Sequence, residues 1–225
     1  MTDELAFWEN SEYLSLKIVF DKVHNILENE LIHRKEHPEL SKKFFEEIAP
    51  ITFLAQHLNA TKIQFTNDKR EHKSFDAMIQ YSDGTEQQIE CTCAIDGAED
   101  ALIDEYLDKY HIVSLNMPIE FEGTKKTRIL HEQPEQFVFK NVIETWNRIN
   151  KLIQKSISKK TSTPKTDYKD AILLVVVDTS GTSVSRLNKY LTKYYSENSI
   201  NKDPFKEIFL ISRNPQNYFD LFIKL

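Results

Sequence analysis

The chain has 225 residues, of which 40% are hydrophobic and 28% charged, and its formal net charge is −6. This size and composition predict one sizeable core or at most two small ones, and they exclude an intrinsically disordered chain. The acidic balance gives no general signature of nucleic-acid binding.

The first third of the chain has the spacing of amphipathic helices. Apolar residues recur at intervals of three and four over residues 12–34, which predicts one helix. A second helix is expected to begin at Pro38 and to be kinked at Pro50. Glu46 and Glu47 lie between the apolar residues of this second helix.

Three strands come next in the chain, followed by a mixture of helices and strands. The elements expected first are strands at 61–66, 74–81 and 85–95, a short helix at 98–110 and a short strand at 111–115. Those expected next are a long helix opening at Pro134, an apolar strand at 171–177, a helix at 183–196, an apolar strand at 207–212 and a helical tail.

That order predicts an α/β fold, with a mixed β-sheet of about four to five strands flanked by helices in a single domain, residues 1–225. We divide the domain into an N-terminal helical extension at 1–37, a core at 38–212 and a C-terminal helical tail at 213–225. No run approaches the ~20 apolar residues of a membrane helix, and the acidic N-terminus lacks the pattern of a signal peptide. We therefore expect a cytoplasmic protein that does not associate with membranes.

The stretch FDAMIQYSDGTEQQIECTC, residues 75–93, reads as two strands joined by a tight turn. A two-residue turn would place Asp76 opposite Cys91 and would put the carboxylates of Asp76 and Glu90 on opposite faces. A three-residue loop with Gly84 in the left-handed conformation would place Asp76 opposite Glu90. Only the second register gathers the apolar residues of both strands on one face, so we favour it.

Two carboxylates directly opposite each other require an explanation, because like charges at a Cβ separation of about 5 Å are destabilising. A shared proton, a basic partner or a divalent cation such as Mg²⁺ would each explain Asp76 and Glu90. The alternative is that this face of the hairpin is simply solvated. Cys91 and Cys93, two apart on the other face, are expected to be core packing rather than a disulfide or a zinc site.

An acidic residue in an early helix, an Asp at the start of one strand and Glu-x-Lys in the next resemble the PD-(D/E)XK nuclease superfamily. The matching residues are Asp76, the triplet Glu90-Cys91-Thr92, and Glu46 or Glu47 as the helix acid. The resemblance covers about residues 38–212 and implies a restriction-endonuclease-like core with a hydrolytic centre. In that centre Asp76 and Glu90 would hold Mg²⁺ or Mn²⁺, and the implied catalytic set is Asp76, Glu90, Thr92 and Glu47.

The departure from the family pattern is at Thr92, which occupies the lysine position. A hydroxyl can hydrogen-bond but supplies no positive charge to offset charge that develops on a phosphate. Lys73, Lys140 and Lys151 are the candidates to replace the missing lysine. Without such a replacement, the chain would retain the fold and lose the cutting activity.

Residues 151–169 contain six lysines and one acidic residue, Asp167. They predict either a solvated helix end with a linker or a surface that binds DNA or RNA. The lysines of that surface would be Lys151, Lys155, Lys159 and Lys160. Two functions follow: a metal-dependent nuclease acting on DNA or RNA, or a non-catalytic member of the fold that binds nucleic acid or a protein.

Overall fold

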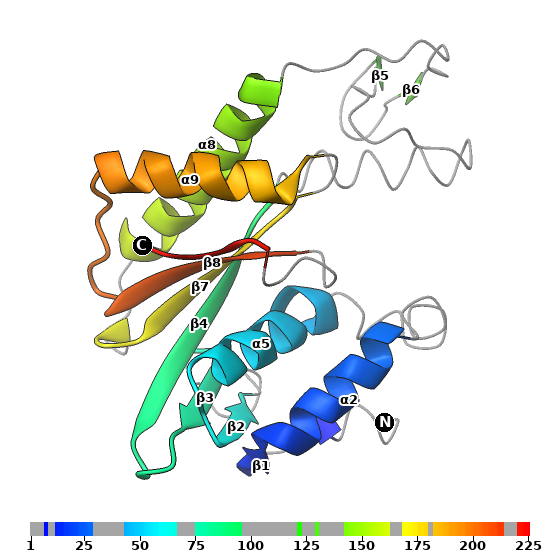
Figure 1. Cartoon of the computed structure of the whole chain (residues 1–225), viewed down its shortest axis with the longest axis vertical. Coiled ribbons are helices and arrows are strands. Elements are labelled where there is room, and N and C mark those ends of the chain that lie inside the picture. Colours follow the sequence, from blue (N-terminus) through cyan, green and yellow to red (C-terminus); the bar gives the residue numbers. More distant parts are fainter. Residues whose placement is uncertain are drawn as a thin grey trace.

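The computed structural model describes residues 7–8, 12–28, 43–66, 75–95, 121–122, 129–130, 142–162, 168–179, 182–213 and 220–225. Within these ranges a seven-stranded mixed sheet separates two layers of helices (Figure 1). Its strands are β1 (Leu14–Ser15), β2 (Lys62–Phe65), β3 (Ala77–Gln80), β4 (Glu86–Ala94), β7 (Ile172–Val177), β8 (Glu207–Ser212) and β9 (Phe222–Lys224). They lie side by side in the order β1-β2-β3-β4-β7-β8-β9. A separate two-stranded pair is formed by β5 (Phe121–Glu122) and β6 (Ile129–Leu130).

The centre of the sheet is parallel and its flanks are antiparallel. β4 pairs with β7 and β7 with β8 in parallel, whereas the other neighbouring strands run antiparallel. All six residues of β7 are apolar and buried. Alternate side chains of β7 point to opposite faces, so that Leu174 and Val176 join one core and Leu173 and Val175 join the other.

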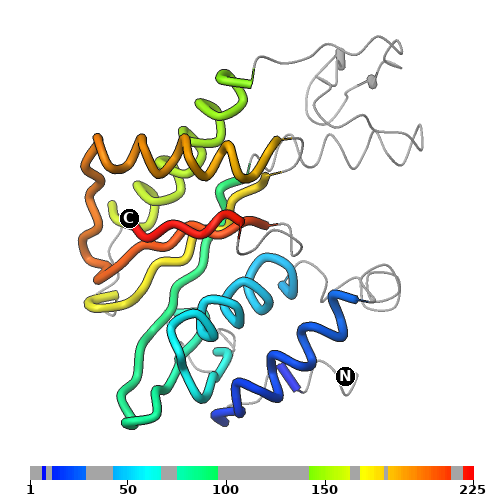
Figure 2. The backbone as a smooth tube through the Cα atoms, viewed as in Figure 1, coloured from blue at the N-terminus to red at the C-terminus, as the bar shows by residue number. Residues whose placement is uncertain are grey.

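Helices cover both faces of this sheet, as the path of the chain in Figure 2 shows. One face is covered by α2 (Leu16–Glu28), by the π-helix η1 (Phe44–Ile48) and by α5 (Ala49–His57), which continues directly from η1. The other face is covered by α8 (Val142–Ser162) and α9 (Val184–Glu197). Each layer buries one apolar stripe, as amphipathic helices do against a sheet.

The expected class is confirmed, since the chain forms an α/β fold with a mixed sheet flanked by helices. The sheet has seven strands rather than four or five. The additional strands include β1 and β9, which have two and three residues and are too short to show an alternating pattern. The helical tail expected at 213–225 is wrong where the structure describes it, because β9 pairs antiparallel with β8.

Some expected elements lie outside the described residues. These are the helix at 98–110, the strand at 111–115 and the first turns of the helix expected from Pro134, which is described from Val142 onward. In the N-terminal extension, the described helix runs from Leu16 to Glu28 and is preceded by the edge strand β1.

Candidate functional site

The hairpin between β3 and β4 has the three-residue loop that the apolar pattern favours. Ala77 pairs with Ile89, and the N–H of Tyr81 donates to the carbonyl of Thr85 at 2.9 Å. Gly84 has a φ of 84°, the left-handed backbone that this loop requires and that glycine adopts without steric penalty. The predicted register is therefore confirmed.

Asp76 lies where β3 and β4 separate. The ladder between the two strands ends at the pair Ala77–Ile89, and from Ile89 onward β4 pairs with β7. The N–H of Asp76 donates to the carbonyl of Ile89 at 3.0 Å, and Asp76 Oδ2 accepts the N–H of Cys91 at 2.7 Å. The carboxylate thus bonds a backbone donor at the point where the regular ladder has ended.

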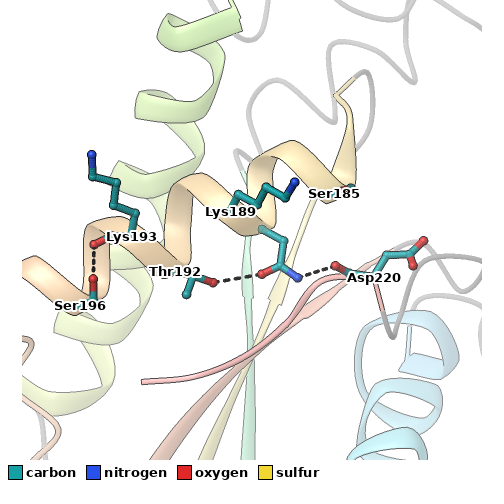
Figure 3. Close-up of a pocket in the computed structure, with 7 residues that line it drawn as sticks. Ser185, Lys189, Thr192, Lys193, Ser196 and Asp220 are labelled. Atoms are coloured by element: carbon teal, nitrogen blue, oxygen red, sulfur yellow. Dashed lines mark hydrogen bonds between the residues drawn. The ribbon is translucent and has the colours of Figure 1, made fainter.

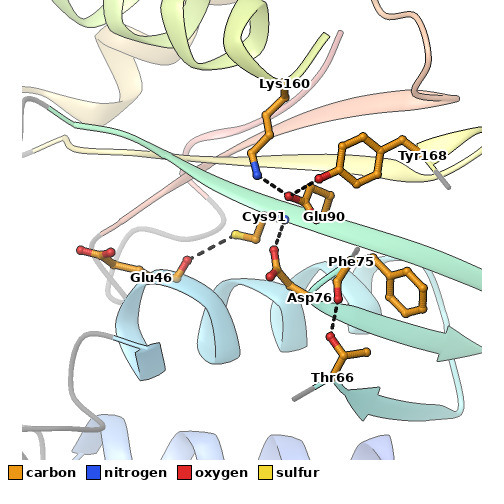
Figure 4. A network of polar contacts seen from close by, with 8 residues as sticks. All are labelled: Glu46, Thr66, Phe75, Asp76, Glu90, Cys91, Lys160 and Tyr168. Carbon is orange, nitrogen blue, oxygen red and sulfur yellow. Dashed lines mark hydrogen bonds and ion pairs between the residues drawn. The ribbon is translucent and has the colours of Figure 1, made fainter. Parts of the chain in front are cut away.

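Glu90 lies between Ile89 and Cys91 in β4 and is only 4% exposed. It is level with Leu173 in the parallel ladder, so its side chain lies on the face that α8 covers. Lys160 of α8 forms an ion pair with Glu90 Oε1, and the hydroxyl of Tyr168 donates to the same oxygen at 2.9 Å (Figure 4). The alternative of a solvated polar face is therefore wrong at Glu90.

The two candidate helix acids, Glu46 and Glu47, both lie in the π-helix η1 but have different partners. Glu46 Oε1 accepts a hydrogen bond from the guanidinium of Arg213 at 2.9 Å, so its charge is compensated. Glu47 is half-buried, and its carboxyl interacts electrostatically with Glu90 and Lys160. Glu47 is therefore the helix acid that interacts electrostatically with the strand carboxylates.

Two carboxyl groups of the site, those of Asp76 and Glu47, have a raised pKa. The pKa of Asp76 is raised to about 7, first by burial and then by the negative charges of Glu90 and Glu47, while Lys160 acts in the opposite direction. Burial also raises the pKa of Glu47; the charges of Glu46 and Glu90 add to that effect, and Lys43 and Lys160 oppose it. The cluster therefore favours a proton or a cation between its carboxylates.

Cys91 and Cys93 belong to the opposite face of β4, as predicted for core packing. Their Sγ atoms lie 3.3 and 3.9 Å from the carbonyl oxygen of Glu46. In an α-helix the carbonyl of Glu46 would accept the N–H of residue 50, but Pro50 has no N–H. The thiol of Cys91 donates a hydrogen bond to this carbonyl. Burial raises the pKa of both thiols, that of Cys93 to about 12, so both are protonated donors and neither is a nucleophile near neutral pH.

Thr92 lies in β4 on the same face as Glu90 and is half-buried. Among the lysines expected to replace the one missing there, Lys73 and Lys140 lie outside the described residues, and Lys151 is exposed on α8. The lysine that contacts a site carboxylate is Lys160, which was expected on a nucleic-acid-binding surface instead.

Sequence reasoning missed Lys160, Tyr168 and Arg213 as residues of the site. A signal for Lys160 is present in the sequence, because it follows the buried residues Ile153 and Ile157 at intervals of four and three on the face of α8 that meets the sheet. Tyr168 lies in a 3₁₀ turn shortly before β7 and Arg213 directly after β8, and neither position has such a periodicity.

The donor set fits part of a magnesium or manganese site. Such ions take one or two carboxylates together with water and phosphate oxygens. Asp76 Oδ1 and Glu90 Oε2 accept no hydrogen bond from the described residues, because the contacts of these carboxylates go to Oδ2 and Oε1. The part of the chain that the structure describes contains no group of three or more His, Cys, Asp and Glu side chains arranged to hold a metal ion.

Comparisons with protein-family models, with curated proteins and with solved structures found no match to this chain. The described helices include none with the length and apolar character needed to cross a bilayer.

Proposed function

We propose that the protein is a divergent PD-(D/E)XK-like, metal-dependent nuclease that hydrolyses phosphodiester bonds in DNA or RNA. One observation carries this proposal: Asp76 and Glu90 lie together where β3 and β4 separate, with the cation of Lys160 on Glu90. Asp76, half-buried beside the buried Glu90, has a pKa that burial and then the charges of Glu90 and Glu47 raise to about 7, which is typical of a functional site rather than a stabilising one.

Each residue has a distinct part in the proposed site. Asp76 and Glu90 would hold Mg²⁺ or Mn²⁺, and Glu47 of η1 would add negative charge to the site rather than a third ligand. The metal, when bound, polarises the scissile phosphate and lowers the pKa of an attacking water. Lys160 supplies the positive charge that Thr92 lacks, because its ion pair with Glu90 brings its ammonium group to the carboxylates.

The second candidate is a non-catalytic protein of the same fold that binds nucleic acid or a protein partner. The ion pair itself favours this reading, because the charge of Glu90 is already compensated by Lys160 without any metal. In that case the cluster would be a buried polar network that fixes the position of α8 on the sheet.

Incubation with labelled single- and double-stranded DNA and RNA, in Mg²⁺, in Mn²⁺ and in chelator, separates the two candidates. We expect cleavage that requires metal and that falls by at least a hundredfold in Glu90→Gln and in Asp76→Asn. We also expect either metal to raise the melting temperature of the wild type and to leave that of Asp76→Asn unchanged.

The matched control is Glu197→Gln, which removes an exposed carboxylate from α9 and should leave cleavage unchanged. Circular dichroism of each variant tests whether a loss of activity reflects unfolding. If no substrate is cut and neither metal changes the melting temperature, the nuclease proposal fails and the non-catalytic candidate stands.

A further inference from the structure

The outer face of α8 carries a row of basic side chains that we call the α8 stripe. It consists of Arg148, Lys151, Lys155 and Lys159, which recur at intervals of three and four and are all exposed. Residues three and four apart share one side of a helix, so the four charges form one line. We propose that the α8 stripe binds the phosphate backbone of a nucleic-acid strand and leads it to the carboxylate site, an inference that rests on the proposed nuclease function.

The charge of α8 is strongly unbalanced towards the positive. α8 contains five basic residues and a single acidic one, Glu144, in a chain whose net charge is −6. Lys151 and Lys155 form no ion pair with any residue that the structure describes. A concentrated positive line on an otherwise acidic protein attracts polyanions to one surface.

The helix also connects the stripe to the site. The stripe runs for about 16 Å from Arg148 to Lys159, at about 1.5 Å per residue. That is the axial length of about five nucleotides of one strand in duplex geometry. The next residue after the stripe is Lys160, which turns inward to Glu90. A strand held along α8 would therefore arrive at the end of the helix where the carboxylates lie.

A membrane surface is the less suitable polyanion. Binding in a bilayer interface requires an apolar helix face that can enter it. The apolar face of α8, with Ile149, Ile153 and Ile157, is buried against the sheet. Val142 and Ile143 are exposed in the first turn of α8, but from Glu144 onward its exposed residues are charged or polar, which suits a phosphodiester backbone rather than lipid.

Binding in chelator tests the stripe without requiring cleavage. Anisotropy of fluorescein-labelled 20-nucleotide single-stranded DNA, single-stranded RNA and duplex DNA would be measured on the full chain between 50 and 200 mM salt. We expect Lys151→Glu with Lys155→Glu to weaken binding of at least one of these at least tenfold. The salt slope should fall by about 1.4–1.8, the loss of two phosphate contacts.

The chain offers a matched control on α9. Lys189 and Lys193 are exposed, four residues apart, and line a surface pocket of about 530 Å³ with Asn188, Thr192 and Asp220 (Figure 3). Lys189→Glu with Lys193→Glu makes the same change in net charge at the same spacing, and binding should stay within twofold of wild type. Equal weakening by both double variants would overturn the stripe as the binding surface.

Other outcomes separate the inference from the nuclease proposal. If wild type and Glu90→Gln bind through the stripe and neither ever cuts, the nuclease proposal fails and the stripe stands. If wild type cuts and the Lys151/Lys155 variant cuts with unchanged KM, the stripe fails and the nuclease stands. Absence of binding to all three probes at 50 mM salt, or binding only to anionic lipid vesicles, also overturns the stripe.

Discussion

At the scale of single residues, the unusual feature is a set of carboxyl groups kept partly out of water. Glu90 is almost fully buried with Lys160 and Tyr168 on one oxygen, and Asp76 accepts a backbone N–H beside it. Buried ion pairs seldom stabilise a fold more than apolar packing of equal volume, because both charges lose their hydration. Loss of one partner is nevertheless strongly destabilising.

Replacement of Lys160 by methionine tests that asymmetry. We expect Lys160→Met to lower the free energy of unfolding by roughly 2–4 kcal/mol, since Glu90 is left buried without its cation. In urea unfolding, Lys160→Met with Glu90→Gln should recover most of the loss, because a neutral amide still accepts the hydrogen bond from Tyr168. The neighbouring exposed Lys159→Met should change stability by less than about 0.5 kcal/mol. Lys160→Met as stable as wild type would contradict a buried pair.

The raised pKa of Asp76 predicts a pH dependence with a definite sign. A carboxyl whose pKa is raised from its ordinary value of 3.8 to about 7 in the folded state loses its stabilising contribution as pH rises through that window. Asp76→Asn, which cannot ionise, should match wild type near pH 4 and be more stable by roughly 2–4 kcal/mol at pH 8. Urea unfolding across this range measures the difference.

Asp83 supplies the control on the same hairpin. It is exposed, and hydrogen bonds from Thr85 lower the pKa of its carboxyl. Asp83→Asn should therefore show no gain in stability between pH 4 and pH 8. A difference between Asp76→Asn and wild type that does not change with pH would contradict the raised pKa of Asp76.

At the scale of elements, local backbone chemistry positions the site. The loop at Gly84 sets the β3–β4 register, and the ladder then ends at Ala77–Ile89, just before the two carboxylates. On the helical side, Pro50 follows η1 and lacks the N–H that an α-helix would direct at Glu46. In this π-helix, Glu46 bonds Arg213 whereas Glu47 interacts electrostatically with Glu90 and Lys160. Single π-helical turns of this kind are frequent at functional sites.

Gly84→Ala isolates the backbone contribution to the hairpin. Apart from Gly84 and its two chain neighbours, no residue has a heavy atom within 4 Å of the position that a Cβ would take, so the only penalty is the positive φ. We expect a loss of about 1 kcal/mol in urea unfolding, and a smaller loss for Gly84→Asn because Asn tolerates the left-handed region better. An alanine variant as stable as wild type would show that the loop does not impose this conformation.

At the scale of the whole molecule, the sheet joins two cores into one structure. The α2 and α5 layer packs on one side and the α8 and α9 layer on the other, and β7 contributes residues to both. The two cores are therefore expected to unfold together, because disruption of β7 in one core also exposes the apolar residues of the other core to water.

Two tryptophans report the two cores separately. Trp8 is buried in the first core, and Trp146 packs against the second. In Trp146→Phe only Trp8 is observed, and in Trp8→Phe only Trp146. Far-ultraviolet circular dichroism of each variant gives the midpoint of its overall unfolding in urea, and this takes account of any effect of the substitution. The fluorescence of the remaining tryptophan should give the same midpoint. A fluorescence midpoint that differs from the dichroism midpoint would instead show that the two layers unfold independently.

Much of this arrangement follows from short-range sequence signals. The alternation along 75–93 and the positive-φ requirement at Gly84 determine the hairpin register, and the apolar runs at 171–177 and 207–212 determine the central strands. These signals suffice because side-chain period and turn geometry act within a few residues. The terminal strand β9 lacked such a signal, since three residues show no period and its pairing with β8 decides its conformation.

The sequence by itself determined the α/β class, the hairpin and the nearness of Asp76 to Glu90, because each depends on neighbouring residues. Only the tertiary structure decided that Glu90 is buried, that Glu47 rather than Glu46 interacts with it electrostatically, and that Lys160 pairs with it from 70 residues away. Such contacts depend on how α8 and η1 pack on the sheet. Burial and electrostatics across that packing have no local signature in the chain.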